Sequence, residues 1–195
     1  MTSRFLRLLV CQLLLTFVTV FSVAQAQAAD GVDITHAHIE STDDGYRLSA
    51  TYDFELNSEL EVAIQHGVEL FFTTEIELTR PRWYWTDDRA IEARQTIRIY
   101  YDVLTREYNV TIKGVAQASV RQSFASLDDA MVMVHRPSRW LIGRRNQLKP
   151  GEVYTVSLRM FMDRGLLAKP IQVKAFNNSE WRLASKDKKF TYRAE

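Results

Sequence analysis

The longest regular alternation of apolar and polar side chains runs from Val68 to Trp85. Its two faces differ in character, with Val68, Leu70, Phe72, Ile76 and Leu78 on one and Glu69, Glu75, Glu77 and Thr79 on the other. Successive side chains of a strand point to opposite faces of a sheet. The stretch therefore predicts an antiparallel strand with one face on a core and the other in water. Thr74 is the weak position on the apolar face, and Pro81 predicts an interruption of regular pairing.

Similar patterns predict shorter strands along the rest of the chain. They cover residues 32–40, 46–56, 90–103, 108–112, 116–124, 140–142, 153–162, 171–176, 181–185 and 189–193. The first two flank Thr42-Asp43-Asp44-Gly45, a turn sequence that predicts a hairpin. The 153–162 stretch is apolar on much of both faces, which predicts a central place in the sheet.

Two stretches carry helix signals instead. Ser58 and Glu61 form a capping-box pattern, and Gly67 suits the end of the helix that follows. Ser126 precedes a second apolar stripe, and Pro137 stops it. Many short strands with two short helices predict an antiparallel β-sandwich, immunoglobulin-like in general architecture. A β-barrel with helical insertions is the alternative that the sequence leaves open.

The first 29 residues have the pattern of a secretory signal peptide. Arg4 and Arg7 precede an apolar run from Leu8 to Val23, and the small-x-small pattern of a cleavage site occurs at 24–26 and 26–28. The apolar run is short for a membrane span, so an uncleaved anchor is the less favoured alternative. Residues 30–195 are predicted to form a single β-rich domain.

Charge and cysteine content narrow the class of protein. The chain has 25 basic and 24 acidic residues, and loss of Arg4 and Arg7 with the leader leaves 23 against 24. A nearly neutral domain gives no support for nucleic-acid binding. Cys11, the one cysteine, lies in the leader, so the mature domain is expected to fold without a disulfide.

The end of the long strand carries the strongest candidate for a binding surface. Aromatic and guanidinium groups dominate binding hot spots, and here they gather at Arg80, Arg82, Trp83, Tyr84 and Trp85. The alternative is that the tryptophans close the end of the core while the arginines lie beside them.

Two weaker candidates follow from charge and metal chemistry. Arg136, Arg139, Arg144 and Arg145, with Lys149 nearby, form a basic cluster that suits lipid head groups or an acidic protein surface, or else a solvated rim. His36 and His38 share one strand face and could chelate a metal, but two ligands are too few without a third from elsewhere.

Catalytic motifs are missing from the sequence. It contains no nucleophile elbow, no HExxH, no phosphate-binding glycine loop and no EF-hand spacing. We therefore expect a binding module that is not an enzyme and has no cofactor, with an envelope protein as its partner. A carrier of a lipid or quinone is the alternative, with Met131, Met133, Met160 and Met162 as adaptable lining residues. A metal-dependent enzyme that uses His36 and His38 is the least favoured hypothesis.

Several stretches together resemble one bacterial family. They include YRLSATYDFELNSELEVAIQHGVEL, RPRWYW, IRIYYDVLTREYNV, SFASLDDA, KPIQVKAF and EWRLAS. The chain is similar to a proteobacterial family of secreted proteins, domain of unknown function 4390. The family has no established activity, so the resemblance implies no catalytic residue. It implies a periplasmic location and, because members are often encoded near sensor histidine kinases, a role beside envelope sensing.

Overall fold

Ten strands dominate the computed structural model, which describes residues 31–80, 88–114 and 117–195. In these residues they form one mostly antiparallel sheet in the order β6-β5-β4-β3-β8-β9-β1-β2-β7, with β10 also paired to β8. The strands are β1 Gly31–Thr42, β2 Gly45–Asp53, β3 Leu70–Arg80, β4 Asp88–Asp102, β5 Glu107–Gly114, β6 Gln117–Phe124, β7 Trp140–Gly143, β8 Val153–Met162, β9 Ala184–Ser185 and β10 Lys188–Arg193.

The long alternating stretch forms β3, in the middle of the sheet between β4 and β8. Its apolar side chains Leu70, Phe72, Ile76 and Leu78 are all buried. Thr74, the weak position on that face, is buried too, and its hydroxyl lies 3.0 Å from the Tyr52 hydroxyl of β2. The polar position is therefore satisfied inside the core, which removes the cost of burying an unpaired hydroxyl. The predicted central place of β8 is confirmed, since it pairs with β3, β9 and β10.

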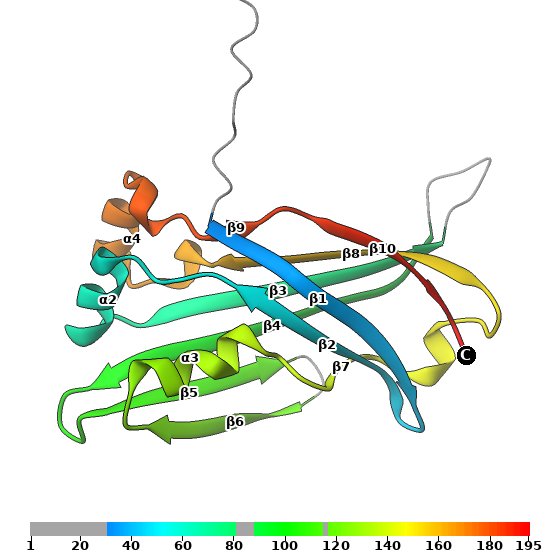
Figure 1. Cartoon of the computed structure of the whole chain (residues 1–195), viewed down its shortest axis with the longest axis horizontal. Coiled ribbons are helices and arrows are strands. Elements are labelled where there is room, and N and C mark those ends of the chain that lie inside the picture. The colour runs from blue at the N-terminus through cyan, green and yellow to red at the C-terminus, as the bar shows by residue number, and fades with distance from the viewer. Residues whose placement is uncertain (1–30, 81–87, 115–116) are drawn as a thin grey trace, which may run out of the picture.

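The sheet curls so that β1 and β2 pass across the face of β3 and β8 (Figure 1). Core side chains meet between these two parts; Phe54, the residue after β2, lies 5.8 Å from Phe72 of β3, measured between ring centroids. The parts are joined through β9, which pairs with β1 at two positions and with β8 at one. The mainly β prediction is confirmed, but the immunoglobulin-like sandwich is not. The shape is a half-barrel, nearer to the barrel alternative, in which the described strands end at β6 and β7 without closing a ring.

Three short α-helices lie in the described residues, where the sequence predicted two. They are α2 Ser58–Gln65, α3 Leu127–His135 and α4 Lys169–Phe176. Ser126 caps α3 as predicted and accepts a hydrogen bond from the Asp129 amide. The predicted cap of α2 is wrong by one residue, because Asn57 rather than Ser58 accepts from the Leu60 amide, at 3.0 Å. No helix in the described part is long and apolar enough to cross a bilayer.

The α4 helix replaces a predicted strand at 171–176. Ile171, Val173 and Ala175 alternate with polar residues, which imitates a strand. Pro170 instead fits the first turn of a helix, where its missing N–H costs no hydrogen bond. Gln172 fixes the helix by donating to the carbonyls of Gly165 and Leu167 in the preceding 3₁₀ turn region, η2 Arg164–Leu166.

The Glu59 carboxylate of α2 joins α2 to α4 and to the 3₁₀ turn Ser179–Trp181 (η3). It accepts hydrogen bonds from the Trp181 indole and the Asn178 amide and pairs with the Lys174 ammonium at 2.7 Å. These partners, led by Lys174, lower the pKa of Glu59 to about 2. The helices α2 and α4 thus form one cap at an end of the long axis of the molecule (Figure 1).

Candidate functional site

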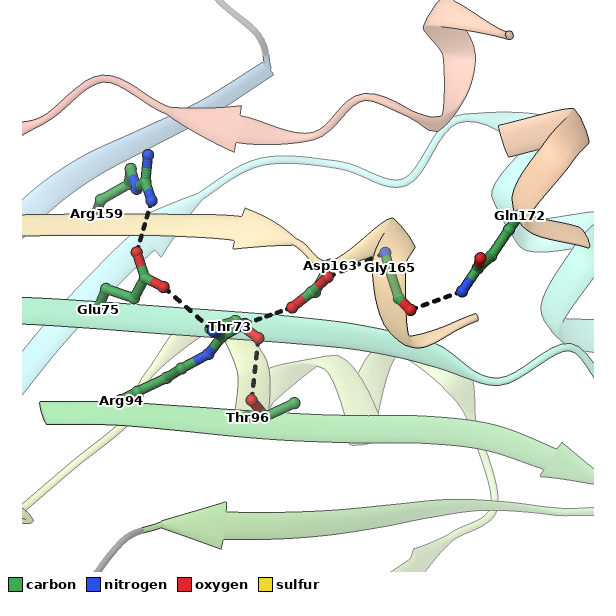
Figure 2. A network of polar contacts seen from close by, with 8 residues as sticks. All are labelled: Thr73, Glu75, Arg94, Thr96, Arg159, Asp163, Gly165 and Gln172. Atoms are coloured by element: carbon green, nitrogen blue, oxygen red, sulfur yellow. Dashed lines mark hydrogen bonds and ion pairs between the residues drawn. The ribbon is translucent and has the colours of Figure 1, made fainter. Parts of the chain in front are cut away.

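The polar side chains of β3 face away from the core, and the strand register arranges them into rows. Glu75 lies opposite Arg94 on β4 and opposite Arg159 on β8. Arg159 Nη2 lies 2.6 Å from Glu75 Oε2, and Arg94 Nη1 lies 3.5 Å from Glu75 Oε1. One carboxylate is therefore shared by two guanidinium groups across three strands (Figure 2). We call this solvent-facing side of β3, β4 and β8 the outer face.

The row continues into the segment after β8. Arg94 also pairs with Asp163, whose second carboxylate oxygen accepts from the Gly165 amide at 3.0 Å. The Gly165 carbonyl in turn accepts from Gln172 of α4 at 2.6 Å, so the network of Figure 2 ends on the cap. The polar contacts thus tie the middle of the sheet to the helical end of the molecule.

An aromatic ring lies against the guanidinium groups of the two arginines. Phe161 lies in the next row, with its ring centroid 4.9 Å from the Arg159 guanidinium carbon and 5.9 Å from that of Arg94. Beside it Thr73 is fully buried, and its hydroxyl lies 3.0 Å from that of Thr96. Guanidinium groups held by a carboxylate and a ring face lose little further freedom when a ligand binds.

Two hollows open on the outer face, and they meet at Arg159 and Asp187. The first has a volume of about 460 Å³, and its charged lining residues are the carboxylates of Glu75, Glu77, Glu92 and Asp187 together with the guanidinium groups of Arg94 and Arg159. The second encloses about 590 Å³ and carries mostly cations, those of Arg159, Arg164, Arg182 and Lys186. We call the pair the charged groove, with an acidic half and a basic half.

The charges within each half do not cancel. In the acidic half Glu77 and Glu92 are direct cross-strand neighbours, and among the described residues they share one cation, Arg89, at 2.8 Å and 3.8 Å from their oxygens. In the basic half Arg182 and Lys186 make no ion pair with a carboxylate of the described residues. The groove therefore presents opposite charges to a ligand at its two halves.

The predicted aromatic surface cannot be placed against this groove. Arg82, Trp83, Tyr84 and Trp85 lie outside the described residues, which stop at Arg80 and resume at Asp88. Arg80 ends β3 three residues beyond Glu77 of the acidic half. Its Nη2 lies 3.1 Å from Asp88 Oδ2 on β4.

The basic cluster is distributed over several elements. Arg136 is the C-cap residue of α3, and Arg144 is the N-cap residue of the 3₁₀ turn Arg145–Gln147 (η1). Arg139 and Arg145 approach carboxylates of the β1–β2 hairpin, at 3.9 Å from Glu40 and 3.6 Å from Asp43. Acidic neighbours thus offset part of the charge that the sequence grouped together.

The two strand histidines lie side by side on β1, with ring centroids 5.3 Å apart. Within the described residues, no group of three or more histidine, cysteine, aspartate or glutamate side chains could hold a metal ion. His135 on α3 serves packing instead, stacked on Phe54 at 4.5 Å between ring centroids. Burial lowers the pKa of His135, while the nearby Asp53 carboxylate opposes that shift.

The sequence patterns did not predict that the groove residues form a site. Glu75, Arg94 and Arg159 each occupy an ordinary polar position of an alternating strand, which is typical of a solvated face. The signal that unites them is the pairing of β3 with both β4 and β8, and sequence patterns do not reveal which strands pair.

Comparison with known proteins identifies the family to which the chain belongs. No curated protein and no solved structure matches the chain. A family model described as "Domain of unknown function (DUF4390)" matches residues 29–191, which include every strand except the last two residues of β10. The resemblance inferred from the sequence is confirmed, and the chain belongs to the DUF4390 family.

Proposed function

We propose that this chain is a periplasmic binding module, not an enzyme, and that the charged groove receives a segment of an envelope protein. The observation that carries the proposal is the separation of charge along the groove, from Glu77 and Glu92 to Arg182 and Lys186. The periplasmic location rests on the signal-peptide pattern of residues 1–29.

The lining of the groove favours a polypeptide over a small apolar molecule. Ligand sites for small molecules are enclosed and mostly apolar, whereas here charged residues are six of the nine that line the acidic half and five of the ten that line the basic half. An extended segment with charges of both signs can satisfy the two halves at once. Electrostatic complementarity of this kind supplies specificity and a fast encounter.

The predicted aromatic segment fits the same proposal as an extension of the site. Residues 81–87 connect β3 to β4, the two strands that supply Glu77 and Glu92. Trp83, Tyr84 and Trp85 therefore belong to the connection between strands of the acidic half. We propose that they add apolar contacts to a partner already oriented by charge.

Site-specific photo-cross-linking tests the proposal. A benzophenone side chain replaces Ser157, which lines the acidic half, or Val132, which is exposed on α3 away from the groove. In living cells we expect an adduct with an envelope protein from position 157 and none from position 132. Glu92→Lys and Arg182→Glu should each reduce that adduct, while Glu61→Lys on α2 should leave it unchanged. Equal adducts from both positions, or an adduct insensitive to both charge reversals, would overturn the proposal.

A carrier of an apolar ligand is a second candidate. A hollow of about 520 Å³ lies at the start of β1, between Gly31–Ile34 and the segment Lys186–Lys188. This exceeds the roughly 300 Å³ at which ligand sites begin. Met131, Met160 and Met162 lie in the hydrophobic core, and Met133 packs against it. Native mass spectrometry of residues 30–195 from the natural periplasm separates the candidates, since a carrier should retain a small-molecule mass and the binding module should not.

A further inference from the structure

The basic half of the groove has more cationic side chains than carboxylates to neutralise them. Arg159 is matched within the outer-face network, because Glu75 and Asp163 balance Arg94 and Arg159. Three cations remain, on Arg164, Arg182 and Lys186, against the one carboxylate of Asp187 in the lining. The excess of positive charge therefore belongs to the residues that follow β8 and η3.

One of these cations is already fixed in place. Arg164 Nη1 donates to the Ala175 carbonyl of α4 at 3.0 Å, and its guanidinium carbon lies 5.0 Å from the centroid of the Phe176 ring. Neither partner carries a negative charge, so the guanidinium keeps its full charge while its freedom is reduced. A fixed planar guanidinium is suited to a bidentate pair with a carboxylate.

The other two cations are exposed to solvent. Arg182 and Lys186 are exposed on either side of β9, and the described residues supply neither with a carboxylate partner. Long cationic side chains next to a fixed guanidinium can close over an anion once it arrives. The half-buried ring of Phe161 lies in the same lining and offers contact to an apolar neighbour of that anion.

We propose that the basic half is a carboxylate-binding site that reads an acidic run in the polypeptide partner, with Arg164, Arg182 and Lys186 as its contacts. The inference rests on the proposed function, because the partner's basic residues would then lie over Glu77 and Glu92 in the acidic half. The inference also gives the order of charges along the bound partner. Its acidic residues lie toward η2, and its basic residues lie toward the end of the groove where β3 connects to β4.

Fluorescence anisotropy at low salt tests the site with defined probes. The main probe is a labelled synthetic peptide in which a run of glutamates precedes a run of lysines. The comparison probes are all-glutamate and all-lysine peptides and inorganic phosphate as competitor. We expect the mixed peptide to bind most tightly and its affinity to fall steeply with salt, since exposed charges are screened.

Two exposed substitutions then locate the contact. Arg182→Gln with Lys186→Gln should weaken binding of the mixed peptide at least about tenfold, which corresponds to the loss of about one charge-assisted hydrogen bond. Lys113→Gln on β5 is the matched control, because Lys113 is exposed on the outer face outside the groove. Circular dichroism spectra should be unchanged in both the double variant and the control.

The outcomes separate the two proposals. Unchanged affinity in the Arg182/Lys186 variant would overturn the carboxylate site, even if cross-linking from position 157 still finds a partner. If inorganic phosphate displaces the mixed peptide as effectively as the all-glutamate peptide displaces it, the site is not specific for carboxylates and the proposal is overturned. Specific peptide binding without any cross-linked partner in cells would retain the site and overturn the proposed function.

Discussion

At the scale of single residues, the structure concentrates polar interactions on a few carboxylates. Glu75 serves two arginines across three strands, and Glu59 serves three donors across the cap. Asp163 serves Arg94 and the Gly165 amide. Each carboxylate joins elements distant in sequence, so its loss affects the placement of an element as well as one contact.

Glu59 makes the stability of the cap depend on pH. Its pKa is lowered from 4.5 to about 2 in the folded protein, so the ionised form stabilises folding above pH 4.5. That contribution should decline as the pH falls from about 4.5 toward 2. Glu59→Gln should lower the urea midpoint at neutral pH, and the difference from the wild type should shrink over that acidic range. Glu61→Gln, exposed on the same helix, is the control, and an equal loss in both variants would contradict the role of Glu59.

At the scale of elements, local signals located two of the three described helices and the N-cap of one of them. Ser126 and Pro137 delimited α3 because side-chain capping and a missing N–H act within a few residues. The Ser58–Glu61 pattern pointed to the right helix and the wrong cap, since Asn57 can also donate to the Glu180 carbonyl, a tertiary contact. The α4 helix was missed because Ile171, Val173 and Ala175 satisfy strand periodicity by coincidence.

The cap of α2 offers a direct comparison of two adjacent residues. Asn57→Ala should cost about 1 kcal/mol of unfolding free energy, the usual loss for an N-cap, and the bond to Glu180 adds to it. Ser58→Ala should change stability little, because Ser58 is an exposed residue inside the helix. Urea unfolding of both variants measures the difference. A larger loss for Ser58→Ala would restore the capping box expected from the sequence.

At the scale of the whole molecule, strand periodicity predicted the elements but not their arrangement. The bounds of the 153–162 strand were confirmed, and its apolar character on both faces indicated a central place. Nothing in Val153–Met162 indicates that its partner is β3, and the choice between sandwich and barrel depends on that pairing. The groove was unpredictable for the same reason, and the Arg80–Trp85 surface stays a prediction because most of it lies outside the described residues.

The arrangement predicts unequal protection of the strands. β8 is paired along both edges, by β3 and by β9 and β10, whereas β6 pairs only with β5 among the described strands. Buried, doubly paired strands open only with the largest free energy. Native-state hydrogen exchange should therefore show the amides of β8 exchanging far more slowly than those of β6. Similar rates in the two strands would contradict the central role of β8.

The pairing of β3 with β8 also governs how a nascent chain can acquire this structure. Glu75 and Arg159 are 84 residues apart, so β3 emerges from the ribosome long before its partner exists. The β1–β2 and β3–β4 hairpins can form early, but the apolar face of β3 stays exposed until β8 is made. Closing so long a loop is slow compared with local pairing, and uncovered strands invite aggregation in the interval. We expect this chain to depend on a holding chaperone until β8 is available to pair with β3.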